Sequence, residues 1–352
     1  GSRLHNGGWK RLFGVFSHAG ERRTAFSVIP RPKENQDSYG LRASFPKGDA
    51  TGTGDGGASA ALQGGGILPM FCFGVFDGHG DQGAKVSGLV SKKVPPRVLT
   101  DVAAPGGGGY AIGGENDIRA ALFAAFSAVQ RELKLHAPFD CRNSGSTAVA
   151  AVLCGTLLML ANVGDSRCVM GSMKAFGGGD GKAGAGARKR LTCTVLTDDH
   201  KPSRPDEHER IRKMGGSVEP SKFQGVFMGP PRVWMHPQRV GGLAVSRAMG
   251  DTAYAACGVS ARPEISTHTV DPATDTFLVL GSDGIFDHMS NEDVVGFVHR
   301  ELEKGRTPEA AAKSLVLVAR GKWREQGHGY VDDVTALVVN LDVVSESLRE
   351  AT

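Results

Sequence analysis

Several marks of zinc-ribbon, membrane and secreted proteins are missing from this chain. Its 352 residues include six cysteines, and no two of them stand in CxxC spacing, which argues against a zinc ribbon or a dithiol redox site. No apolar run approaches the ~18 residues that a transmembrane helix requires, and the N-terminus lacks the apolar core of a signal peptide. We therefore expect an intracellular protein, cytoplasmic or nuclear, with reduced thiols and no membrane span.

A strong net charge is missing as well. Lys and Arg number 41 against 37 Asp and Glu, which leaves a formal net charge of +4. So dilute a charge, without a ladder of aromatic and basic residues, argues against a nucleic-acid module. Hydrophobic residues make up 40% of the chain, which excludes a wholly disordered protein and leaves enough apolar material for a sizeable core.

Glycine is present in excess, at 50 of 352 residues, and three clusters near 46–66, 105–114 and 176–187 carry much of it. Such stretches bury little surface, so we expect them to be insertions on the surface. Between a tail at 1–9, whose Gly-Ser start is typical of a cloning scar, and a tail at 343–352, the sequence predicts one domain, residues 10–342. We expect it to be a monomer.

The regular elements predicted between the insertions are mainly strands. Short apolar or β-branched runs bounded by Gly, Asp or Ser lie at 70–76, 146–153, 157–163, 191–196, 276–280 and 334–339. Apolar residues at helical spacing predict a helix over 116–136, and further helices are expected from Ser290 and from Pro308. Because strands follow one another in pairs, the sequence favours an α+β domain of antiparallel sheets with helices packed outside.

Acidic residues recur at the ends of the predicted strands, next to glycine. Asp77, Asp165 and Asp283 each follow such a strand, Asp287 comes four residues after Asp283, and Asp332 precedes the last strand. An aspartate in this place is ordinarily a turn residue that accepts local amide hydrogen bonds. The recurrence of aspartate at strand ends in four segments favours a common site.

A common site of this kind would need cations. If their strand ends converge, Asp77, Asp283 and Asp332 bring about three negative charges together, which cannot all persist without compensation. Oxygen ligands select magnesium, manganese or calcium over zinc. Two such ions would favour a bound hydroxide and an anionic substrate. His79, two residues after Asp77, is either a metal ligand or solvated turn residue, or a general acid that protonates a leaving oxygen.

Nine segments resemble, in order, the motifs of the metal-dependent protein phosphatases of type 2C, in forms similar to those of plant and protist members. They are ENQDSYG (34–40), FGVFDGHGDQGA (73–84), SGSTAVAAVL (144–153), LANVGDSRCVM (160–170), LTDDHKPSRPDEHERI (196–211), PRVW (231–234), GGLAVSRAMGD (241–251), FLVLGSDGIFD (277–287) and DDVTALVV (332–339). The resemblance implies a central β-sandwich of two antiparallel sheets flanked by α-helices, in α-β-β-α layers.

The resemblance also implies roles for single residues. Asp77 would bridge two Mn²⁺ or Mg²⁺ ions, the Gly78 carbonyl would bind one of them, and Asp283 and Asp332 would bind the other. Asp37 would join the cluster through water. Two further positions, Asp165 and Asp287, match those that hold a third, weaker ion in some members. His79 matches the general acid of the family.

The implied activity is hydrolysis of phosphoserine and phosphothreonine monoesters in phosphoprotein substrates. A hydroxide bridging the two ions would attack phosphorus directly, without a phosphoenzyme, and His79 would protonate the leaving oxygen. Alternatives are a catalytically weak or silent relative that acts as a binding or scaffold protein, and a hydrolase of small phosphoesters.

Two departures from the family pattern concern metal and phosphate binding. Gln36 stands where the family often has Glu, and its amide would reach a metal-bound water with one charge fewer. Pro32 stands where animal members have a phosphate-binding Arg, so Lys33 or Arg31 is the candidate phosphate contact.

The segment 198–239 resembles the family's flap beside the active site and is rich in basic residues. Its charges either help to hold phosphopeptides or, as we favour for residues 210–213, form the wet face of a helix.

Overall fold

The computed structural model describes residues 12–19, 21–22, 31–32, 34–44, 70–103, 114–176, 188–235, 242–326 and 330–342. The predicted tails at 1–9 and 343–352, and most of the three glycine-rich insertions, lie outside these ranges. Within them, no helix is both long and apolar enough to cross a membrane.

Two five-stranded sheets form the centre of the molecule, and every pairing in them is antiparallel. The first sheet has the order β1 (Phe13–His18), β18 (Val334–Asn340), β16 (Asp275–Gly281), β10 (Arg167–Phe176) and β11 (Arg188–Val195). The second has the order β15 (Glu264–Thr269), β9 (Leu157–Val163), β8 (Ala148–Cys154), β5 (Met70–Phe76) and β4 (Ser38–Ser44).

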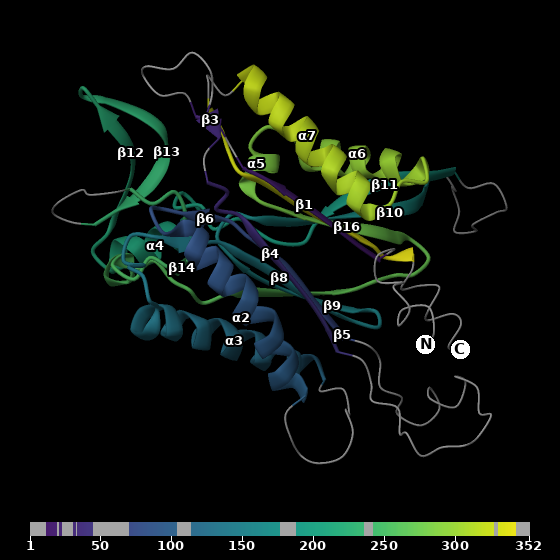
Figure 1. Ribbon diagram of the computed structural model, residues 1–352, viewed down its shortest axis with the longest axis horizontal. Coiled ribbons are helices and arrows are strands. Elements are labelled where there is room, and N and C mark those ends of the chain that lie inside the picture. The colour runs from purple at the N-terminus through teal and green to yellow at the C-terminus, as the bar shows by residue number, and fades with distance from the viewer. Residues whose placement is uncertain are drawn as a thin grey trace.

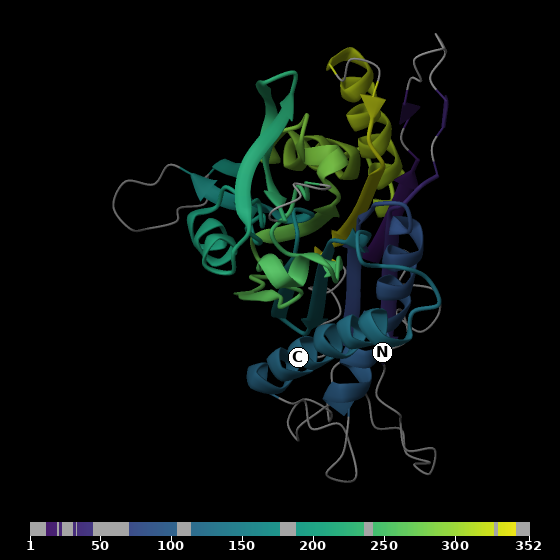
Figure 2. The same ribbon diagram turned by 90° about the vertical axis from the view of Figure 1, so that its left-hand side faces the viewer.

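Helices cover the outer face of each sheet. The second sheet packs against α2 (Gly83–Ala103) and α3 (Glu115–His136), and the first against α6 (Asn291–Glu303) and α7 (Pro308–Gln326). Figure 1 and Figure 2 show the two helix pairs on opposite sides of the sheets. The predicted α-β-β-α sandwich is therefore confirmed.

Strand β5 illustrates why these sequences form buried strands. Alternate side chains of a strand point to opposite faces. Phe71 and Phe73 pack in the core between the two sheets, while Cys72 and Phe76 pack against the helices. Because both faces are covered, the run is apolar throughout, as expected for a strand buried on both sides.

Local sequence signals placed α3, α6 and α7, whereas α2, which contains Pro95 and Pro96, was not predicted. The apolar stripe of α3, from Ile118 to Leu133, is buried, and the Ser290 hydroxyl accepts a hydrogen bond from the Asp293 amide at 3.1 Å to cap α6. One predicted strand was wrong in its extent. The run 146–153 is divided at Thr147 into β7 (Gly145–Ser146) and β8, because the Thr147 amide bonds the Asp77 carbonyl at 2.8 Å.

Short elements gather at one end of the sandwich, at the left of Figure 1. They are β2 (Glu21–Arg22), β3 (Arg31–Pro32), β6 (Gly78–His79), β7, α4 (Pro205–Lys213), β12 (Ser217–Phe223), β13 (Val226–Trp234), β14 (Met249–Gly250), the 3-10 helix η3 (Tyr254–Cys257), α5 (Asp283–Phe286) and β17 (Tyr330–Val331). In Figure 2 the β12–β13 hairpin stands out from the rest of this end.

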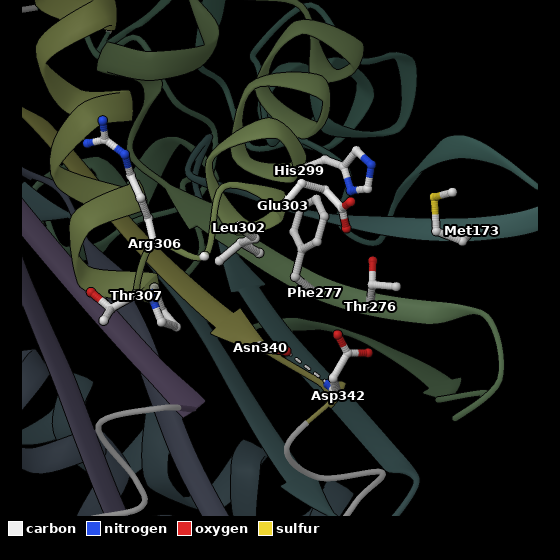
Figure 3. Close-up of a pocket in the computed structure, with 12 residues that line it drawn as sticks. Met173, Thr276, Phe277, His299, Leu302, Glu303, Arg306, Thr307, Asn340 and Asp342 are labelled. Carbon is white, nitrogen blue, oxygen red and sulfur yellow. Dashed lines mark hydrogen bonds between the residues drawn. The ribbon is translucent and has the colours of Figure 1, made fainter.

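A pocket of about 400 Å³ lies at the opposite end of the first sheet (Figure 3). Phe277, near the start of β16, lines it together with Leu302 and Glu303 of α6 and with Asp342 after β18. The last residue of β16, in contrast, leads into α5 and the predicted acidic site. The pocket and the acidic site are thus separated by the length of that strand.

Candidate active site

Four of the predicted carboxylates lie where strands of both sheets begin or finish at the same end of the sandwich. Asp77 follows β5, and Asp37 precedes its neighbour β4. Asp283 follows β16, and Asp332 shortly precedes its neighbour β18. Because β18 lies against β4 and β5 across the sandwich, residues far apart in the sequence meet at this end.

The backbone of Asp77 is held on both sides. Its amide donates a hydrogen bond to Thr147 Oγ1 at 2.9 Å, and its carbonyl accepts one from the Thr147 amide at 2.8 Å. Thr147 Oγ1 also lies 2.7 Å from the Ser166 hydroxyl. These contacts fix the backbone from which the Asp77 carboxyl projects.

Two of the carboxyl groups have a buried oxygen without a partner. The Ser282 hydroxyl donates to Asp37 Oδ2 at 2.8 Å, but Asp37 Oδ1 has no hydrogen-bond partner among the described residues. The same holds for Asp283 Oδ1. Asp332 Oδ1, in contrast, accepts hydrogen bonds from the Tyr330 hydroxyl at 3.0 Å and from the Asp333 amide at 2.8 Å.

Burial and neighbouring carboxylates raise the pKa values of Asp77 and Asp37. The pKa of Asp77 lies well above its ordinary value, first because the group is removed from water and then because of the negative charges of Asp37, Asp283 and Asp332. Burial is likewise the main reason why the pKa of Asp37 rises to about 6. This end of the sandwich therefore gathers carboxyl groups that repel one another when charged.

Asp165 and Asp287 extend the same cluster. Burial raises the pKa of Asp283, and the charges of Asp165, Asp332 and Asp287 raise it further. Asp165 is buried and forms an ion pair with Lys201. We call the six residues Asp37, Asp77, Asp165, Asp283, Asp287 and Asp332 the acidic cluster.

The acidic cluster has the chemistry of a divalent-cation site. Its donors are hard oxygens, which suit Mg²⁺ and Mn²⁺, and the unpartnered oxygens of Asp37 and Asp283 are free to accept a cation. Within the described ranges, however, no three His, Cys, Asp or Glu side chains stand in the arrangement of a ready-made metal site. The residues fit the ions in type and charge, and their ligand geometry is not preformed.

The backbones of Gly78 and Gln36 pack closely together beside Asp77. A Cβ atom at Gly78 would lie 2.5 Å from the carbonyl oxygens of Gln36 and Gly83, so only glycine fits this close approach. The Gln36 side-chain amide donates to the Gly80 carbonyl at 2.8 Å. In this structure Gln36 therefore closes the turn after β6, a role that the sequence did not indicate.

His79 pairs with an aspartate that the sequence did not single out. Its Nε2 lies 2.6 Å from Oδ2 of Asp251, which follows β14. Burial lowers the pKa of His79, but the charge and hydrogen bond of Asp251 outweigh it, so that the pKa is raised. Asp251 is the last residue of the motif at 241–251, but the sequence does not show which residue it contacts. Asp251 and His79 meet because β6, which contains His79, and β14, which precedes Asp251, both pair with β7.

The side chains of the two candidate phosphate contacts lie outside the described part of the chain. Lys33 lies outside the described residues, and of Arg31 only the backbone, in β3, is described.

The basic residues of the flap are largely engaged within the protein. Arg210 contacts the buried Glu207, Arg204 contacts Asp206 and Glu264, and Lys213 pairs with Glu209. The predicted wet face of the helix is therefore correct for Lys213 and wrong for Arg210, whose partner is buried.

Comparison with known proteins gives a consistent family. The family model described as Protein phosphatase 2C matches residues 59–325. The chain is 36% identical to "Probable protein phosphatase 2C 72" of Arabidopsis thaliana over 288 residues, which cover 79% of each chain. It is 39% identical to "Probable protein phosphatase 2C 48" of Oryza sativa subsp. japonica over 280 residues, covering 75% of this chain and 73% of the relative.

Solved structures share the fold at lower identity. A serine-threonine phosphatase 2C from Toxoplasma gondii superposes with a TM-score of 0.66 and 23% identity, over 93% of this chain and 94% of the other. A sex determining protein of C. elegans gives a TM-score of 0.60 at 20% identity, over 97% of this chain and 67% of the other.

Proposed function

The chain belongs to the protein phosphatase 2C family and is a serine/threonine phosphatase, and on this premise we propose how it acts. Its substrates are phosphoserine and phosphothreonine monoesters in proteins. Hydrolysis takes place at the acidic cluster with two Mn²⁺ or Mg²⁺ ions, by direct attack of water-derived oxygen on phosphorus and without a phosphoenzyme. Residues 10–342 act as one catalytic domain.

The observation that carries this proposal is the uncompensated charge of the acidic cluster. Asp77 and Asp283 lie among carboxylates that raise the pKa of both, and Asp37 and Asp283 each leave a buried oxygen without a partner. Buried polar atoms are ordinarily satisfied. A cluster that leaves its carboxylates repelling one another is suited to bind cations.

We assign the metal ligands within the acidic cluster as follows. Asp77 would serve both ions, with the Gly78 carbonyl on one and Asp283 and Asp332 on the other, while Asp37 would act through water. When bound, two divalent ions would supply the Lewis acidity that lowers the pKa of a water between them and balance the phosphate charge. Asp165 and Asp287 would hold a third, weaker ion, in competition with Lys201 at Asp165.

His79 would act as the general acid. Burial lowers the pKa of His79, but the charge and hydrogen bond of Asp251 raise it above its ordinary value, which favours the protonated ring that a general acid requires. As the P–O bond breaks, its electron pair stays on the serine or threonine oxygen, which takes the proton from the ring. Arg31 or Lys33 would contact the phosphate.

Two further parts of the proposal concern the state of the protein. All six cysteines are free thiols and five of them are buried, which fits a reducing compartment, cytoplasmic or nuclear. We propose that the protein works as a monomer on phosphoprotein partners.

The decisive experiment is manganese-dependent release of phosphate from a phosphothreonine peptide, with the wild type beside Asp283→Asn. We expect activity that requires metal, stops with chelator and falls at least about 100-fold in the variant. The matched control is Asp275→Asn, at the other end of β16, where the carboxylate is buried but pairs with His268 at 3.0 Å. Its turnover should stay within about threefold of the wild type.

Other outcomes would favour the alternatives. Folded wild type without activity at millimolar manganese would favour a silent relative that binds phosphoproteins. Efficient hydrolysis of a small phosphoester that is not inhibited by the phosphopeptide would favour a small-molecule hydrolase.

A further inference from the structure

Asp251 is a buried carboxylate whose one hydrogen-bond partner among the described side chains is His79. It is 2% exposed, whereas the side chain of its partner His79 is 29% exposed. Among the described residues, Asp251 Oδ1 has no hydrogen-bond partner and Oδ2 lies 2.6 Å from His79 Nε2. A carboxylate only accepts hydrogen bonds, so the ring donates its Nε2–H and its other nitrogen, Nδ1, is left for the substrate.

The backbone at Asp251 is held in a conformation that few residue types adopt. Its φ is +43°, in the left-handed region that side chains other than Gly, Asn and Asp rarely adopt. The Asp251 amide donates to the Ser144 carbonyl at 3.0 Å. The preceding Gly250 is held twice by the Gln130 side chain of α3, at 2.8 and 3.0 Å. The surroundings thus force Asp251 into place.

The opposite strand is shaped to admit the pair. Gly145 of β7 lies against both side chains, and a Cβ atom there would stand 2.7 Å from His79 Nε2 and overlap the Asp251 carboxylate. Gly145 has no positive φ, so glycine is needed here for space and not for backbone freedom.

A purely structural carboxylate in this protein is arranged differently. Glu207, which is also buried, receives hydrogen bonds from Arg210, Arg247 and Ser246. The Asp251 carboxylate, in contrast, contacts one side chain among the described residues, and that side chain is the proposed general acid, His79.

We propose that Asp251 is the positioning residue of His79, fixing the ring so that Nε2–H points to the carboxylate and Nδ1–H points to the leaving oxygen. The inference rests on the proposed function. In the step, the P–O bond breaks with its electron pair on the serine or threonine oxygen, Nδ1 gives that oxygen its proton, and the ring keeps Nε2–H on Asp251.

The test compares two substrates with different leaving groups. A phosphothreonine peptide releases a basic alkoxide that needs the proton, whereas p-nitrophenyl phosphate releases a stable phenolate that does not. In Asp251→Gly, which suits the positive φ, we expect kcat on the peptide to fall about 100-fold. On p-nitrophenyl phosphate we expect a fall of less than about threefold. KM should change little, because His79 would act on the transition state.

Three variants sharpen the comparison. Asp251→Asn keeps the shape and tolerates the positive φ, so it should lose less, about 10-fold on the peptide. In a His79→Asn background, Asp251→Gly should have almost no further effect, since residues that act as a unit are non-additive. Asp275→Asn, at a buried carboxylate that contacts His268 far from the site, should leave turnover of both substrates unchanged.

A measurement that does not depend on turnover separates this inference from the proposed function. In the metal-free protein, the His79 Nε2 proton should be slow to exchange and shifted downfield in nuclear magnetic resonance spectra, and Asp251→Gly should abolish this signal. An inactive wild type with the signal would overturn the proposed function and leave the pair intact. Equal losses on both substrates, additivity with His79→Asn, or no protected proton would overturn the positioning role.

Discussion

Buried carboxylates occur in two regions of this protein, and their surroundings differ in kind. Glu207 of α4 is fully buried and meets Arg210 and Arg247 as well as the Ser246 hydroxyl. The acidic cluster holds more carboxylates and one described ammonium contact, from Lys201 to Asp165.

The two surroundings shift pKa values in opposite directions. Burial alone would raise the pKa of Glu207, but hydrogen bonds from Arg210, Arg247 and Ser246 outweigh it and lower the pKa. In the acidic cluster, burial and mutual repulsion act together to raise the pKa of Asp77. A carboxylate with its countercharge inside the protein serves the fold, whereas carboxylates without one are available for cations from outside.

The largest expected effect is on the activity of Asp77→Asn. We expect turnover to fall about 1000-fold, or about 4 kcal/mol in activation free energy, because this residue is assigned to both ions. The metal-free variant should nevertheless unfold at the same or a higher urea concentration, because a repelled buried charge is removed. Phosphate release and urea unfolding in chelator check the two halves. A less stable metal-free variant would mean that the cluster is structural like Glu207.

The opposite pattern is expected at Glu207→Ala. Removing one partner of a buried ion network leaves uncompensated charges and costs about 3–4 kcal/mol of unfolding free energy. Urea unfolding measures this loss, and Glu209→Ala is the matched control, since Glu209 pairs with Lys213 in an exposed i,i+4 pair on the same helix. The control should change stability by less than about 0.5 kcal/mol. Equal effects at the two positions would remove the distinction drawn here.

The pH dependence of stability gives a third, smaller effect. Burial, and then the charge of Arg247, lower the pKa of His200 from 6.5 to about 4. Below about pH 6.5, His200 therefore binds a proton in the unfolded chain but not in the folded protein. The free energy of unfolding decreases as the pH falls. Between pH 7.5 and 5 the expected loss is about 2 kcal/mol, measured by urea unfolding of the metal-free protein. The loss should shrink in His200→Gln, and an unchanged slope there would assign it to other groups.

Local patterns predicted antiparallel sheets with helices outside and five members of the acidic cluster, whereas the sandwich and the sixth member, Asp37, were implied by the resemblance. Buried strands such as β5 are apolar throughout, and glycine next to a strand-end aspartate, as in Asp77-Gly78, is visible in one short window. The order of the motifs then named the fold as a whole.

What the sequence left open were partners joined only by the tertiary fold. Asp251 and His79 are separated by 172 positions, and no pattern in either segment points to the other. Gln36 was expected to face a metal-bound water, and it bonds Gly80 instead. Lys201 lies in the segment 198–239 that resembles the family's flap, yet it contacts Asp165 of the acidic cluster.

Lys201 gives the last and smallest prediction, because it brings to the acidic cluster the kind of countercharge that Glu207 has. Its ammonium is the internal countercharge of one carboxylate in the acidic cluster, so Lys201→Gln makes that corner resemble the rest. Without metal, the variant should lose about 1 kcal/mol of unfolding free energy, because Asp165 loses its partner and Lys201 is partly exposed. Manganese should restore more stability to the variant than to the wild type, since an ion then meets no competing ammonium at Asp165. Thermal unfolding with and without manganese measures both. An equal gain from manganese in the two proteins would mean that Lys201 is only a structural partner, like the arginines around Glu207.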